Sequence, residues 1–108
     1  MKDRPSRVQA RLAAGSPQAQ VLAPLVLVLG SRAGLPIEQL DDLVLALELI
    51  VRGQPSVRSV ELVAGGGDLE VTLTAVDPGW LEEHRGMLAV LVTELEQRSE
   101  GLRLRAAG

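Results

Sequence analysis

Residues 35–53 read LPIEQLDDLVLALELIVRG, and this stretch has the pattern of a helix with two clear ends. Pro36 suits the first helical turn because its missing N–H would be unpaired there, and Gly53 is suited to ending the helix. The residues at helical spacing form one apolar face: Leu40, Leu43, Val44, Leu47, Ile50 and Val51. Leu45 and Leu49 widen this face. We therefore expect a central core helix that other elements cover on most sides.

The composition limits the chemistry available to the chain. Its 108 residues suit one domain, and with 46% hydrophobic but only 1% aromatic residues the core must be built from Leu, Val, Ala and Ile. The sequence has no Cys, which excludes disulfides and thiolate metal sites, and a single histidine, His84, which excludes multi-histidine sites within one chain. The net charge of −3 makes nucleic acid a poor partner. No membrane span or signal peptide is visible, so we expect a cytoplasmic protein.

The segment before the central helix predicts a strand and a helix. Residues 1–6 are polar and are expected to be disordered. Residues 7–12 alternate as a half-buried strand does. A helix is expected over 16–32, with Ser16 as its N-cap. Pro24 lies inside that helix, where it removes a backbone hydrogen bond, so we expect one bent helix.

The segment after the central helix predicts a hairpin, a helix and a strand. Residues 57–63 and 69–76 alternate as strands, and the glycine turn at 65–68 joins them. A third helix is expected over 80–98, with Gly86 weakening its first half. Residues 102–105 form a short terminal strand, with Leu102 and Leu104 facing inward.

This order predicts a single α+β domain over residues 7–106 with the arrangement β-α-α-β-β-α-β. We expect a four-stranded, mainly antiparallel sheet with the helices packed on one face. The other face of the sheet is expected to be polar, and it carries Gln9, Arg11, Glu61, Glu70, Thr72, Thr74, Arg103 and Arg105.

Local sequences in this order point to a known family. The run SRAGL at 31–35, LDDL at 40–43 and the Ala46-Leu47 pair are similar to the second-helix segment of the anti-sigma-factor serine kinases, in the GHKL (histidine-kinase-like) ATPase superfamily. The Asp77-Pro78-Gly79 run and the residues from Gly86 stand where that family has its glycine-rich nucleotide boxes. The resemblance spans most of residues 7–106 and implies a reduced histidine-kinase-like ATPase domain from a bacterial regulator of transcription.

The chain departs from the family where the family binds nucleotide. The catalytic Glu of the family falls on Leu49, or on Glu48 if the register moves by one. The metal-holding Asn falls on Gly53 or Arg52, and the sequence contains no Asn. The second glycine of the first box is Leu81. The resemblance therefore implies a degenerate member without catalytic residues, a metal site or a cofactor, and the residual nucleotide-site candidates are Glu48, Asp77, Gly79 and Gly86.

Four residues have two interpretations each. Asp77 is either a residual adenine-binding residue or a turn residue before proline, and we favour the turn. Glu48 is a relic of the catalytic site or an exposed carboxylate, and we favour the second. Trp80 either anchors the third helix or lies in a partner interface. His84 is a ligand or general base, or an ordinary surface histidine, and because it stands among charged residues we favour the second.

By resemblance, we expect a non-catalytic regulatory protein that acts by binding another protein. The partner would be a sigma factor, an anti-anti-sigma protein or a second copy of the chain. One alternative is an ATP-binding serine/threonine protein kinase of the anti-sigma type, which would use ATP and Mg²⁺ in an unorthodox site. Another alternative is an oligomeric structural module.

The first helix suggests where association occurs. Residues 21–29 are almost entirely apolar, and Val26 and Leu27 cannot both lie on one buried face because adjacent helical positions are about 100° apart. We therefore expect a homodimer, or a heterodimer that replaces it, through this helix and the neighbouring edge near the N-terminal strand. The interface candidates are Leu22, Val26, Leu27 and Trp80. The alternative is that Pro24 bends the helix enough to bury these side chains.

Overall fold

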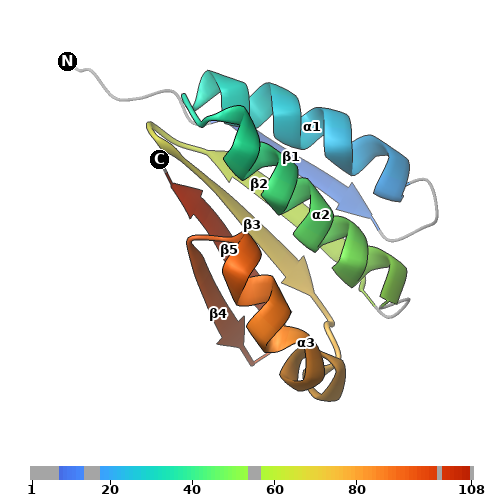
Figure 1. Ribbon diagram of the computed structural model, residues 1–108. Coiled ribbons are helices and arrows are strands. Elements are labelled where there is room, and N and C mark those ends of the chain that lie inside the picture. Colours follow the sequence, from blue (N-terminus) through green and yellow to red (C-terminus); the bar gives the residue numbers. More distant parts are fainter. Residues whose placement is uncertain (1–7, 14–17, 54–56, 100, 108) are drawn as a thin grey trace.

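The structure, a computed structural model, describes residues 8–13, 18–53, 57–99 and 101–107 (Figure 1). The expected disorder of residues 1–6 and the expected N-cap at Ser16 lie outside the described residues. The elements in chain order are β1 (Val8–Ala13), α1 (Gln18–Arg32), α2 (Ile37–Gly53), β2 (Ser59–Ala64), β3 (Asp68–Thr74), α3 (Pro78–Leu91), β4 (Glu94–Arg98) and β5 (Gly101–Ala107).

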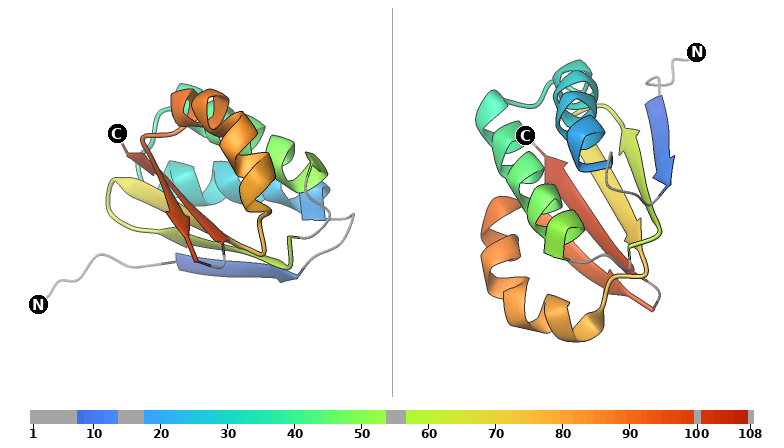
Figure 2. Two further views of the ribbon diagram at one scale, coloured as in Figure 1. Left: turned by 90° about the horizontal axis from the view of Figure 1, so that it is seen from below. Right: turned by 90° about the vertical axis from the view of Figure 1, so that its right-hand side faces the viewer.

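The strands form one sheet in the order β1-β2-β3-β5-β4, and every neighbouring pair is antiparallel. The three described helices lie on one face of this sheet (Figure 2). The predicted α+β class, with an antiparallel sheet and helices on one face, is confirmed. The predicted hairpin is also confirmed, because β2 pairs with β3 from Ser59 opposite Thr74 to Ala64 opposite Leu69.

The sheet has five strands where four were predicted, because residues 94–98 form β4 and not the end of a helix. α3 ends at Leu91, and Val92 already has extended backbone angles (φ −132°, ψ 160°). Leu95 fits a helical spacing from Leu88, but it also fits a strand in which it alone turns toward the core. Glu94 and Glu96 flank it and form ion pairs with arginines of β5, and these cross-strand pairs stabilise the extended form.

The connection between α1 and α2 is a capped turn that ends α1 just before the central helix begins. Gly34 has a φ of 84°, a conformation that glycine adopts readily. The Leu35 N–H donates to the Gly30 carbonyl at 3.0 Å, and the Gly34 N–H donates to the Ser31 carbonyl at 3.1 Å. This pair of bonds is a Schellman cap. Gly34 therefore closes α1.

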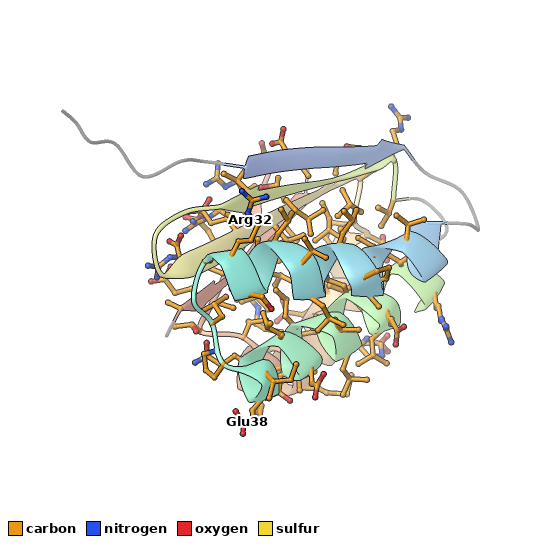
Figure 3. All side chains as sticks on the ribbon, turned by 90° about the horizontal axis from the view of Figure 1, so that it is seen from above. Arg32 and Glu38 are labelled. Carbon is orange, nitrogen blue, oxygen red and sulfur yellow. The ribbon has the colours of Figure 1, made fainter. Side chains whose placement is uncertain are left out.

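α2 is the central helix, as predicted, and it lies between α1 and α3 in the helical layer (Figure 1). Its inward residues are fully buried: Leu40, Leu43, Ala46, Leu47 and Ile50. They pack against the buried residues of β2, β3 and β5, which alternate along each strand with less buried residues. The buried strand residues include Val60, Leu62, Val71, Leu73, Leu102 and Leu104. Figure 3 shows side chains filling the space between the sheet and the helices, while the labelled Arg32 and Glu38 lie at the surface.

α1 is one helix from Gln18 to Arg32 with an exposed Pro24 inside it, so the prediction of a single helix through Pro24 is confirmed. One detail of α2 differs from expectation. Leu45 of α2 was expected to be covered, but its exposed fraction is 47%. The part of α2 around Leu45 therefore borders an open region of the helical layer.

Candidate functional site

An open groove of about 660 Å³ lies between the C-terminal half of α2 and the N-terminal half of α3. The two helices run antiparallel, so Gly53 and Trp80 meet at one end of the groove and Leu45 and Met87 border the other (Figure 1). The lining residues are Leu45, Glu48, Leu49, Arg52, Gly53, Trp80, His84 and Met87.

The start of α3 places Trp80 in this groove. Asp77 caps the helix, because its Oδ2 atom accepts a hydrogen bond from the Trp80 N–H at 2.9 Å, and Pro78 occupies the first turn. Leu81, the next residue, is buried in the core. The indole then lies against Gly53, since a Cβ atom added at Gly53 would be only 2.9 Å from the Trp80 Nε1 atom. A side chain at position 53 would therefore displace the indole.

His84 extends the aromatic surface of the groove. Its ring is stacked on the Trp80 indole, with ring centroids 4.2 Å apart and an interplanar angle of 17°. Its Nδ1 atom lies 2.8 Å from the Trp80 carbonyl oxygen. The interpretation of His84 as an ordinary surface histidine missed this stack. The signal was present in the sequence, since residues four apart on a helix are neighbours.

The groove is mainly apolar. Leu45 and Met87 have exposed fractions of 47% and 45%, and Leu49 is half-buried. The polar groups in the lining are the Glu48 carboxylate and the Arg52 guanidinium of α2, together with His84. This set of side chains suits the burial of an apolar group beside a few charges.

The predicted nucleotide-site residues separate in the structure. Glu48 lines the groove and is half-buried. Asp77 and Gly79 lie exposed at the start of α3, outside the groove lining, where Asp77 acts as the helix cap. Gly86 is exposed and also outside the lining, although its neighbour Met87 is part of it. The structure therefore brings only one of the four candidates into the groove.

The groove nevertheless includes the positions to which the resemblance assigns the catalytic Glu and the metal-holding Asn. Both positions proposed for the catalytic Glu and both proposed for the metal-holding Asn line it: Glu48, Leu49, Arg52 and Gly53. Mg²⁺ requires oxygen ligands, and the lining offers one carboxylate and no amide. In the part of the chain that the structure describes, no group of three or more His, Asp or Glu side chains is arranged to hold a metal. The residues do not fit Mg²⁺·ATP.

The predicted interface on α1 requires a correction. Leu22 and Val26 have exposed fractions of 1% and 0%, so they are core residues and cannot form a surface. Leu27 is half-buried and packs against the core. The physical reason is that α1 is covered by the sheet on one side and by α2 on another. Burial therefore extends round much of α1. Of the predicted interface residues, Trp80 is half-buried and lines the groove.

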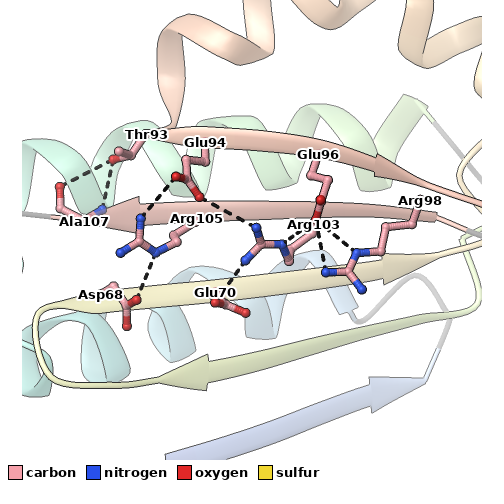
Figure 4. A network of polar contacts seen from close by, with 9 residues as sticks. All are labelled: Asp68, Glu70, Thr93, Glu94, Glu96, Arg98, Arg103, Arg105 and Ala107. Atoms are coloured by element: carbon pink, nitrogen blue, oxygen red, sulfur yellow. Dashed lines mark hydrogen bonds and ion pairs between the residues drawn. The ribbon is translucent and has the colours of Figure 1, made fainter.

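The open face of the sheet carries a network of ion pairs (Figure 4). Arg103 of β5 contacts Glu70 at 3.0 Å and Glu96 at 2.9 Å, and Arg105 contacts Asp68 at 3.0 Å. Hydrogen bonds from Arg103 and Arg98 lower the pKa of Glu96 below its ordinary value. The side chains of Gln9 and Arg11 lie outside those described. The described charges of this face are largely matched to one another, as expected for a surface in water.

Comparison of the sequence with protein-family models gives no match, and comparison with curated proteins gives none either. The resemblance to anti-sigma-factor kinases rests on the residues quoted for it. No helix within the described ranges combines the length and the apolar character that crossing a membrane requires.

Proposed function

We propose that this chain is a non-catalytic regulatory protein that acts by binding another protein. By resemblance it is a relative of the anti-sigma factors whose nucleotide site has lost its chemistry, and it works in the cytoplasm. The partner class is then a sigma factor, an anti-anti-sigma protein or a second copy of the chain.

One observation carries this proposal. The groove at the positions of the family's catalytic Glu and Asn is walled by Leu45, Leu49, Trp80 and Met87. Such a surface favours apolar groups and supplies little for a triphosphate, which needs several cations or backbone N–H groups around it. Large exposed apolar side chains bordered by charges are typical of protein interaction sites.

Affinity capture from a lysate of the source organism, with and without Mg²⁺·ATP, tests the proposal. We expect a protein to be retained in stoichiometric amount, whether or not nucleotide is present. Radiolabelled γ-phosphate should not be transferred to it. Transfer of the label would contradict the proposal and favour the serine/threonine kinase alternative. Failure to retain any protein would also count against the proposal.

Self-association is a second candidate, favoured by the outer surface of α1. Val21 and Val28 have exposed fractions of 40% and 56%, and because they are seven residues apart they lie on the same side of the helix. We expect static light scattering at tens of micromolar to give the mass of a dimer. Val28→Glu should give the mass of a monomer with unchanged circular dichroism, since the side chain is exposed. A monomeric parent protein would exclude the homodimer.

A further inference from the structure

The groove between α2 and α3 is bounded by two helices and is open to the binding of a third. It extends from the Leu45 end to the Gly53 end of α2, which is roughly 12 Å or two helical turns. Two antiparallel helices form its walls, and Leu45, Leu49, Trp80 and Met87 supply apolar surface from both sides. Amphipathic helices bind in such grooves through apolar residues spaced at i, i+3 or i+4, and i+7. Methionine adapts its shape to a partner, and tryptophan is enriched at binding hot spots.

The charges beside the groove are predominantly negative. Asp41 lies one turn before Leu45 on the same side of α2, and Glu83 lies one turn before Met87 on α3. Glu48 is the carboxylate in the lining, and helical spacing places Asp41, Asp42 and Glu83 on the same sides of α2 and α3 as lining residues. Arg52 is the guanidinium in the lining, and Arg85 of α3 instead donates to Gln97 of β4 at 3.1 Å. An apolar slot with an acidic border requires an occupant that is apolar on one face and basic at its edges.

We propose that the α2–α3 groove binds a basic amphipathic helix of a partner protein. This inference rests on the proposed function and assigns it a surface and a partner chemistry. The apolar face of the partner helix lies on Leu45, Leu49, Trp80 and Met87. Its lysine or arginine side chains meet the carboxylates of α2 and α3. A second copy of this chain is a poor occupant, because its α2 and α3 would bring the same acidic border toward the first.

A synthetic peptide tests the groove with the full chain. The probe is an amphipathic peptide of about 18 residues, long enough to form a helix. It carries Leu at i, i+3, i+4 and i+7 and Lys elsewhere. Trp80 is the sole aromatic residue of the chain, so its fluorescence reports on the groove alone. We expect saturable binding that weakens as salt rises, because the charges at the border are exposed. The same peptide with Glu in place of Lys should not bind.

Variants separate apolar contact from charge. Leu45→Gln and Met87→Gln should each weaken binding about tenfold, since both residues form the walls. Val90→Gln is the matched control on α3, because Val90 is 81% exposed and lies outside the lining. This variant should bind the peptide with the affinity of the parent protein. Asp41→Asn combined with Asp42→Asn should weaken binding and flatten its salt dependence. None of these side chains belongs to the buried core, so the fold is retained.

Several results would overturn the inference. These are no saturable binding below about 1 mM, equal binding of the acidic peptide, or no effect of Leu45→Gln and Met87→Gln. The proposed function can fail separately. If the peptide fails but a captured protein partner is still retained by the Met87→Gln variant, the groove assignment is wrong and regulation by protein binding stands. If Mg²⁺·ATP itself changes Trp80 fluorescence at micromolar concentration, the proposed function is wrong.

Discussion

Leu47 and Leu45 lie two positions apart on α2 in opposite environments: Leu47 is fully buried, whereas Leu45 is 47% exposed. We expect Leu47→Ala to lower the free energy of unfolding by about 2–5 kcal/mol, because it opens a cavity in the core. Leu45→Ala is the matched control and should change it by about 0.5 kcal/mol or less. Denaturant unfolding measures both. Equal effects at the two positions would contradict the assignment of the buried face of α2.

Substitution of alanine for two helical glycines should change the stability of the protein in opposite directions. At Gly30 a Cβ atom would overlap the side chain of Leu40, which is fully buried and has little room to move. Gly30→Ala should therefore destabilise the protein by about 1–3 kcal/mol. At Gly86 a Cβ atom meets nothing within 4 Å. Gly86→Ala should stabilise α3 by about 0.5–1 kcal/mol, and thermal unfolding of the two variants compares them directly. Stabilisation by Gly30→Ala would mean that α1 and α2 pack less closely.

Single residues also show what the sequence could and could not predict about the groove between α2 and α3. Glu48 and Trp80 could be singled out from the sequence, one as an acid on an apolar helix and the other as the sole aromatic. That both line one groove depends on the antiparallel packing of α2 and α3 and on Gly53, which leaves room for the indole. Spacing along one helix predicts neighbours on that helix, but not which second helix it faces.

At the scale of elements, β4 differs from β2, β3 and β5. Four of its five residues are exposed, and Leu95 alone is half-buried. The strand is held mainly by backbone pairing to β5 and by ion pairs from Glu94 and Glu96 to Arg103 and Arg105. Such pairs are individually weak, and they act here as a network.

Acid should therefore loosen the C-terminal edge of the sheet. The pKa of Glu96 is lowered from 4.5 by its hydrogen bonds to Arg103 and Arg98. A lowered folded-state pKa means that the stabilisation is present above pH 4.5 and is lost as the pH falls through the folded-state value. We expect the denaturant midpoint to fall on acidification below pH 4.5, and the protection factors of the β4 amides to fall with it. Glu96→Gln should reduce this pH dependence, whereas Glu82→Gln, an exposed acid of α3, should not. Equal pH profiles for both variants would contradict this role of Glu96.

The elements themselves were largely predictable. β2, β3 and β5 alternate with a period of two, and α2 carries both its apolar period and its end signals, so local sequence fixes their type. β4 was mistaken for helix because a run with Leu88, Leu91, Val92 and Leu95 satisfies the helical period. What decides its conformation is the pairing with β5, and this non-local interaction is invisible to a local pattern.

At the scale of the whole molecule, the two surfaces have different characters. The open face of the sheet bears charges that are largely paired with one another (Figure 4). The helical layer instead leaves apolar side chains exposed on α1 and in the groove, notably Val28, Leu45 and Met87. We therefore propose that other proteins bind to the helical layer. The sequence indicated this character through the excess of apolar residues in α1 and α2, but it could not separate the buried Leu22 and Val26 from the exposed Val28.

The central claim is that the groove between α2 and α3 serves protein binding and no longer binds nucleotide. Isothermal titration calorimetry of the full chain with ATP and Mg²⁺ tests it most directly. Because the groove offers one carboxylate, no amide and an apolar wall, we expect no binding tighter than about 1 mM, a free energy of roughly −4 kcal/mol. Micromolar affinity that depends on Mg²⁺ would contradict the claim and establish a working nucleotide site.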